Sequence, residues 1–76
     1  MDIKSIIRKK RENKELTKEE IRYFVGKLVK EEITDAQAAA VLSYIYINGL
    51  TEDEILYLSV AMALSFDSEA ASFARM

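Results

Sequence analysis

The phrase LTKEEI at residues 16–21 recurs almost unchanged as LTEDEI at residues 50–55. In both copies a threonine stands three positions before a glutamate, which is the signature of a capping box. The threonine oxygen accepts from the glutamate's backbone N–H, and the glutamate side chain accepts from the threonine's. An apolar residue flanks each box on both sides, as expected for a hydrophobic staple. The repeat therefore predicts two helix starts, with Thr17 and Thr51 as the N-caps.

A weaker copy, ITDAQA, lies between these two at residues 33–38, with Thr34 and Gln37 as its box. The three caps are thus 17 residues apart, so each unit holds one helix of about 13 residues and a short connection. Ser68 continues this spacing as a weaker fourth candidate, because no Glu or Gln follows it at position 71. The chain is predicted to be a succession of short helices.

Helix ends and composition agree with this prediction. Gly49, preceded by an asparagine, is suited to a left-handed helix C-terminus, and Asn13 suits the end of a first helix. The sequence has no proline and two glycines, and it lacks the alternation expected of strands. We predict an all-α fold, a small bundle of four to five short helices in one domain over residues 1–76. The predicted helices span residues 3–12, 18–31, 35–47 and 52–66, with the tail beyond unassigned.

The residue inventory limits the possible chemistry. Without cysteine or histidine, the chain has no disulfide, no triad with a histidine base and no ordinary zinc site. The acidic clusters at residues 31–35 and 52–54 lack the ligand pattern of a calcium loop, and the second suits the first turn of a helix. We predict no catalytic, cofactor-binding or metal-binding residue and no cofactor. No apolar run reaches the roughly 20 residues of a membrane span, and no signal-peptide layout is present, so we expect a cytoplasmic protein without a membrane partner.

Charge is distributed unevenly along the chain. Residues 1–14 carry six Lys or Arg against two acidic residues, a net of +4, whereas the remainder carries five against eleven, a net of −6. A solvated, cation-rich helix end explains the basic segment, because positive charge is favoured near a helix C-terminus. The alternative is nucleic-acid binding that weakens steeply with salt. We favour the first interpretation and predict no nucleic-acid partner.

The third and fourth predicted helices are apolar on two sides, unlike the ordinarily amphipathic second helix. One stripe of the third helix comprises Ala38, Val41, Leu42 and Ile45, and one face of the fourth comprises Ile55, Leu58 and Met62. Either neighbouring helices wrap these helices completely, or their second faces meet another chain. We predict the latter, a homodimer through helices three and four. The candidate interface residues are Ala36, Ala40, Ser43, Ile47, Tyr57, Val60 and Leu64.

Several runs together resemble a known family. They are SIIRKKRENKELTKEEIRYFV at residues 5–25, IYINGLTEDEI at residues 45–55 and LSVAMA at residues 58–63, with an Ala-rich helix between the first two. These runs resemble the N-terminal helical domain of the pyrimidine-nucleoside (thymidine) phosphorylases. The Ile-Asn-Gly also resembles archaeal AMP phosphorylase, and a looser likeness extends to anthranilate phosphoribosyltransferase. The resemblance covers about residues 3–65.

The resemblance implies a role in nucleotide metabolism. Such enzymes are pentosyltransferases that cleave nucleosides with phosphate, and they pair a helical domain with a larger α/β domain across the substrate cleft. It implies that this chain serves homodimerisation and forms one wall of that cleft. The family's Lys-His-Ser-Thr-Gly-Gly phosphate segment has no counterpart here, so the chain alone is expected to be inactive. It would meet phosphate and nucleoside only with a missing α/β domain.

A stand-alone helical interaction module is the alternative. Two of the 17-residue units make 34 residues, the length of a tetratricopeptide unit, although the aromatic, glycine and proline signature of that repeat is absent.

Overall fold

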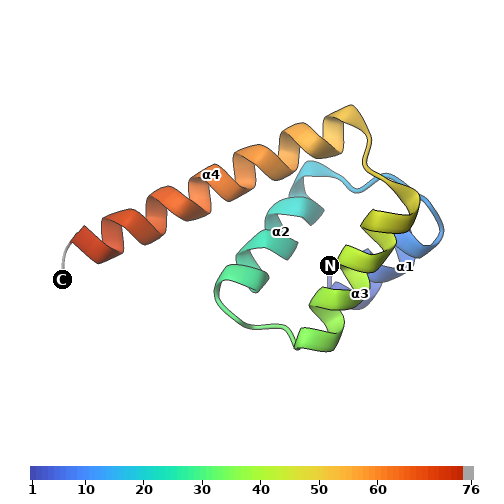
Figure 1. Ribbon diagram of the computed structural model, residues 1–76, viewed down its shortest axis with the longest axis horizontal. Coiled ribbons are helices and arrows are strands. Elements are labelled where there is room, and N and C mark those ends of the chain that lie inside the picture. Colours follow the sequence, from blue (N-terminus) through green and yellow to red (C-terminus); the bar gives the residue numbers. More distant parts are fainter. Residues whose placement is uncertain (75–76) are drawn as a thin grey trace.

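The computed structural model describes the backbone of residues 1–74 and the side chains of residues 1–65. Over that range it contains four helices and no strand (Figure 1). The helices are α1 (Ile3–Arg11), α2 (Lys18–Val29), α3 (Asp35–Asn48) and α4 (Glu52–Ala74). The predicted all-α fold is confirmed, with four helices where four to five were predicted.

All three predicted capping boxes are formed. The threonine oxygen of each box accepts from a backbone N–H at 3.1 Å, and the returning bond from the threonine N–H measures 2.9–3.1 Å. The three pairs are Thr17 with Glu20, Thr34 with Gln37, and Thr51 with Glu54. α1 begins differently, because the Asp2 carboxylate accepts from the backbone N–H of Ser5 at 2.8 Å. Local sequence therefore determines where every helix begins.

The ends of α1 and α3 were predicted to within one residue, whereas those of α2 and α4 were not. Asn13 has φ 57° and Gly49 has φ 78°, the positive φ expected at both positions, although ψ of −177° places Gly49 outside the left-handed helical region. The end of α2 was not anticipated, because Glu31 adopts φ 56° there although it is neither glycine nor asparagine. The N–H of Glu32 donates to Lys27 O at 2.9 Å and closes this turn. α2 consequently ends at Val29, two residues before the predicted boundary.

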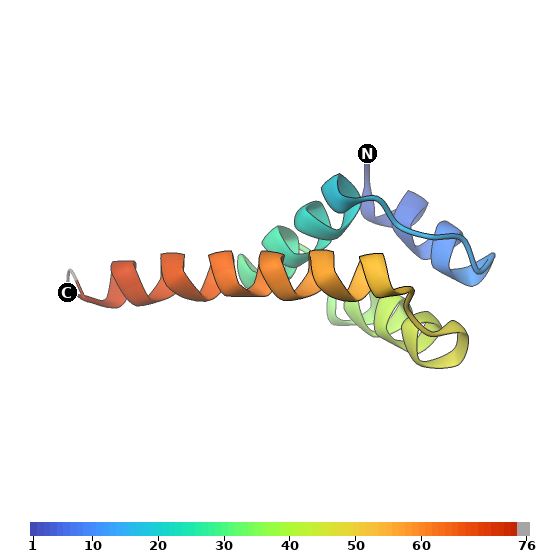
Figure 2. The ribbon, with the colours of Figure 1, turned by 90° about the horizontal axis from the view of Figure 1, so that it is seen from above.

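α4 is longer than predicted. It runs for 23 residues to Ala74, so Ser68 lies inside the helix and the proposed fourth cap is not formed. The chain offers no Glu or Gln at position 71 and no glycine after 49, so nothing local interrupts the helix. Figures 1 and 2 show its C-terminal half projecting past the other helices, along the 43 Å long axis of the domain. Within the described range, no helix is both long and apolar enough to cross a membrane.

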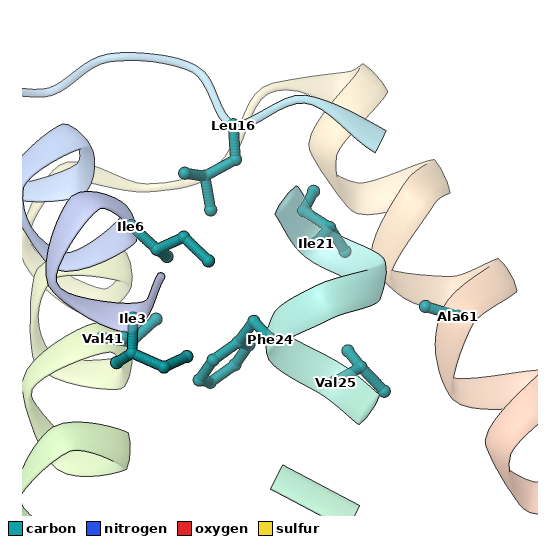
Figure 3. Close-up of a cluster of buried hydrophobic side chains, with 8 residues drawn as sticks. All are labelled: Ile3, Ile6, Leu16, Ile21, Phe24, Val25, Val41 and Ala61. Atoms are coloured by element: carbon teal, nitrogen blue, oxygen red, sulfur yellow. The ribbon is translucent and has the colours of Figure 1, made fainter. Parts of the chain in front are cut away.

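Helices that are not neighbours in the sequence form the main contacts. α1 lies against α3, and α2 lies against α4, while α1 and α2 touch only slightly. Phe24 on α2 points toward Ile3 and Val41 of the first pair, and Ala61 lies on the side of α4 that faces α2 (Figure 3). The buried core comprises Ile3, Ile6, Leu16, Ile21, Phe24, Val25, Val41 and Ala61.

Candidate functional site

The candidate interface residues of α3 lie largely in the open. Ala36 and Ser43 are exposed, and Ile47 has 69% of its surface exposed, whereas Ala40 is half-buried. On the buried side, Val41 is fully enclosed. Leu42 was expected in the same stripe as Val41 but is 52% exposed, because it is rotated 100° from Val41 and away from the contact with α1.

On α4 the buried line runs between the two predicted faces. It consists of Glu54, Leu58 and Ala61, of which the first and last are buried and Leu58 packs against the core. Ile55 and Met62 were assigned to one packed face, but each is more than half exposed. The way in which α4 packs against α2, rather than the hydrophobicity of its residues alone, decides which side of α4 is buried.

Of the candidate interface residues on α4, Val60 and Leu64 are exposed, while Tyr57 is partly buried and packs against the core. α3 and α4 do not pack along each other over the described residues, so the structure does not itself bring the two halves of the candidate interface into contact. The seven residues remain a predicted surface.

The outer sides of α3 and α4 are apolar over an unusual extent for a small domain. No Asp, Glu, Lys or Arg occurs from residue 36 to residue 51 or from residue 55 to residue 66. Tyr46 is 90% exposed, and it stands among several other large apolar residues at least two-fifths exposed. These are Leu42, Ile47, Ile55, Leu56, Val60, Met62 and Leu64. We call this set, together with Tyr46, the outer apolar faces. Large exposed apolar patches on soluble proteins usually mark binding sites.

A buried ion pair lies where α1 ends and α4 begins. Lys10 is only 2% exposed and Glu54 is fully buried. The Lys10 ammonium donates to both carboxylate oxygens of Glu54 at 3.2 Å and to the carbonyl oxygen of Gly49 at 3.0 Å. The Lys10 side chain thereby reaches from α1 across to the α3–α4 connection.

Glu54 accepts from two backbone groups as well. The N–H of Leu16, just before α2, donates to one carboxylate oxygen at 2.8 Å, and the N–H of Thr51 donates to the other at 2.9 Å. Asn48 closes the group by donating its side-chain amide to the carbonyl oxygen of Lys10 at 2.6 Å. Among the described side chains, no buried polar atom lacks a hydrogen-bond partner. We call Lys10, Asn48, Glu54 and their backbone partners the polar joint.

A second ion pair occupies the other glutamate capping box. Lys9 donates to one oxygen of Glu20 at 2.6 Å, and the N–H of Thr17 donates to that same oxygen at 2.9 Å. Lys9 is 30% exposed, so this pair is nearer to water than the polar joint. Adjacent lysines of α1 thus bind the glutamates of the two repeated phrases.

The basic segment is therefore not wholly the solvated helix end that the sequence indicated. Lys9 and Lys10 bind internal carboxylates, which removes two of its six cations from any role in recruiting an anion. A signal for Lys10 was present, because it continues the apolar stripe of Ile3, Ile6 and Ile7 at helical spacing. That position places the Lys10 stem on the buried side of α1, but it does not identify Glu54 as the partner.

Both capping glutamates are held in their charged form. Burial acts to raise the pKa of Glu54, but the N–H groups of Leu16 and Thr51 and the ammonium of Lys10 outweigh it and place the pKa below the ordinary 4.5. Burial likewise acts to raise the pKa of Glu20, and hydrogen bonds from Lys9 and Thr17 outweigh it. Both carboxylates therefore bind a proton less readily in the folded chain than in the unfolded one.

Stability is accordingly expected to fall in acid. Because the pKa values of Glu20 and Glu54 are lowered on folding, the unfolded chain takes up protons first as the pH drops. We expect the free energy of unfolding to be level above about pH 5 and to decline as the pH falls through 4.5 toward the lowered pKa values. Urea unfolding at a series of pH values measures this, with Glu20→Gln giving a shallower decline. A flat profile between about pH 5 and pH 3 would contradict it.

No catalytic arrangement is evident in the described part of the chain. No three acidic side chains there converge closely enough to hold a metal ion. The acidic cluster at residues 31–35 contains the left-handed Glu31 and contributes Glu32 to an ion pair with Lys27 at 2.7 Å. The cluster at residues 52–54 provides Glu54 to the polar joint. Both clusters have structural explanations.

The chain matches the family model described as the glycosyl transferase family, helical bundle domain, over residues 4–66. It is 44% identical over 62 residues to a pyrimidine-nucleoside phosphorylase of Staphylococcus aureus (strain USA300), which covers 82% of this chain and 14% of that protein. It is also 44% identical over 62 residues to an AMP phosphorylase of Methanococcoides burtonii, covering 82% of this chain and 12% of that protein. An AMP phosphorylase of Methanosarcina barkeri is 34% identical over 64 residues, 84% of this chain and 13% of that protein. No solved structure matches the chain.

Proposed function

The chain belongs to the glycosyl transferase family as its helical bundle domain, and from that premise we propose that it serves self-association and forms one wall of a nucleoside phosphorylase-like substrate cleft. The chain spans only 12–14% of the length of the curated relatives named above. Phosphorolysis of a nucleoside or nucleotide is therefore proposed for an assembly that includes a further α/β part. In this proposal the helical domain contributes the contact between two copies and one wall of the cleft, and it performs no chemical step.

The outer apolar faces carry the self-association part of the proposal. They combine large exposed side chains, such as Tyr46 and Ile47, with neighbouring small ones, such as Ser43, and they contain no charge that would have to be desolvated. Residues of this kind occupy the centre of homodimer interfaces, where charged residues are depleted. An identical second copy presents the same surface and satisfies the requirement of a two-fold interface.

Ile47→Glu is expected to weaken self-association about tenfold or more, because a charge would replace an apolar side chain in the contact. Ile47 is the better test position than Ala40, whose half-buried side chain also serves the interior. Sedimentation equilibrium across a wide concentration range measures the dissociation constant. Circular dichroism of the same samples confirms that the helices are retained.

Leu28→Glu is a matched control for this experiment. Leu28 is the second-last residue of α2, as Ile47 is of α3, and it is also exposed, but it lies outside the outer apolar faces. It should leave the dissociation constant unchanged. A wild-type chain that stays monomeric at every concentration would end the self-association proposal. An equal change of the dissociation constant in Ile47→Glu and Leu28→Glu would show that the outer apolar faces are not the interface.

A further inference from the structure

The two outer apolar faces lie on different halves of the fold. α3 is paired with α1, and α4 is paired with α2. Since α3 and α4 do not pack along each other, neither helix directly sets the direction of the other over the described residues. The angle between the two helix pairs therefore decides whether the faces form one continuous surface.

At one end of the molecule, the polar joint crosses the boundary between the pairs. Lys10 and Asn48 come from the α1–α3 pair, whereas Glu54 comes from α4. The joint is closed by directional bonds of 2.6–3.2 Å, and its central ion pair is screened from water. Hydrogen bonds restrict both distance and angle, so they define one approach of the pairs more narrowly than apolar contact does. The partly exposed Lys9–Glu20 pair crosses the boundary nearby with one ionic contact.

At the other end, the boundary carries a surface pocket beside the packed side chains of Ile3, Phe24 and Val41. A pocket of about 310 Å³ lies between the first turns of α1 and α3 and the second half of α2, with Ile3, Tyr23, Lys27 and Gln37 in its wall. Ile3 and Lys10 occupy opposite ends of α1, so the pocket and the polar joint are separated by the length of that helix. The two helix pairs are thus joined by the polar joint at one end, whereas a pocket lies beside their apolar contacts at the other.

We propose that Lys10 and Glu54 are positioning residues that fix the angle between the α1–α3 pair and the α2–α4 pair. Apolar contacts such as those of Phe24 tolerate small changes of angle, whereas the ion pair holds α1, the start of α4 and the segment before α2 on one buried carboxylate. The angle is a property of a single chain. Its consequence for alignment of the outer apolar faces rests on the proposed function.

The absence of cysteine makes the angle measurable with two spin labels. Ala39→Cys on α3 and Ser59→Cys on α4 place nitroxides at exposed positions, one on each helix pair and neither among the candidate interface residues. Labelled chain is diluted with unlabelled chain, so that electron–electron double resonance reports distances within one molecule. The otherwise unchanged sequence should give a single narrow distance distribution.

Lys10→Met is expected to broaden that distribution and shift its mean. Lys14→Met is the matched control, because it removes an ion pair of 3.1 Å with Glu12 that stays within the segment directly after α1 and outside the pocket. It should leave the distribution as it is. An unchanged distribution in folded Lys10→Met, or equal broadening in both variants, would overturn the proposal.

Circular dichroism shows whether Lys10→Met retains its helices. If it does not, Glu54→Gln is measured instead, because it keeps an acceptor oxygen at position 54 and removes the charge that binds Lys10 across the boundary between the pairs. A smaller broadening is expected there, and none would overturn the proposal. Sedimentation equilibrium of the unlabelled chain is a separate measurement. A monomeric wild type would refute the proposed self-association, whereas the distance distributions would still decide whether Lys10 fixes the angle between the helix pairs.

Discussion

Glu54→Gln is expected to lower the free energy of unfolding by about 3 kcal/mol, because it leaves the buried Lys10 ammonium without its countercharge. Three donors, from Lys10, Leu16 and Thr51, converge on both carboxylate oxygens. A glutamine offers one acceptor oxygen, so its amide group must face at least one of these donors. For a domain of this length, whose total stability is about 4–11 kcal/mol, this loss is a large fraction.

Glu20→Gln is the matched control for that substitution. Glu20 has the same place in the other capping box, but both of its hydrogen bonds, from Lys9 and Thr17, fall on a single oxygen. A glutamine oxygen can accept both, and the lost ion pair is partly exposed, so the expected cost is about 1 kcal/mol or less. Chemical denaturation of the two variants at pH 7 gives the comparison. Equal losses would show that the ion pair with Lys10 has no special weight.

Phe24→Ala is expected to cost about 3–5 kcal/mol. Phe24 is 3% exposed and lies between the two helix pairs, directed toward Ile3 and Val41 (Figure 3). Its removal leaves a cavity at the boundary that carries most of the core, next to a side of the molecule that already holds a pocket. The expected loss is a large fraction of the total stability of a domain of this size.

Phe24→Leu is the comparison variant, because it removes part of the side-chain volume at position 24 but keeps an apolar side chain there. It retains an apolar side chain of intermediate size and should cost about 1.5 kcal/mol or less. Leu28→Ala, at an exposed position on the same helix, should change stability by less than about 1 kcal/mol. Urea unfolding monitored by circular dichroism measures all three. A Phe24→Ala chain as stable as Leu28→Ala would place the core elsewhere.

Helix starts could be predicted from the sequence because they depend on contacts within four residues. Thr17, Thr34 and Thr51 cap their helices as the repeated phrase indicated. The end of α2 could not be predicted, because Glu31 has no intrinsic preference for the left-handed conformation. The hydrogen bonds from the N–H groups of Glu31 and Glu32 to Leu28 O and Lys27 O close the turn in this conformation.

The faces of the helices were predicted less well than their starts. An apolar residue such as Ile55 or Met62 has the same local preference whether or not a neighbour covers it, and the pairing of α4 with α2 leaves both exposed. The polar joint was missed for a related reason. Lys10 and Glu54 are 44 residues apart, and each has an ordinary local role, as a helix C-terminal cation and a capping glutamate. Only the three-dimensional arrangement joins them.

The pairing of α1 with α3 and of α2 with α4 also bears on how the chain reaches its native state. Each helix finds its main partner across an intervening helix, so neither half of the sequence holds a self-sufficient helical hairpin. Loops must close over distant residues before most apolar area is buried, which slows folding relative to a bundle of sequential neighbours. The interleaved order therefore favours folding of the four helices as one cooperative unit, because each pair is joined through a helix of the other.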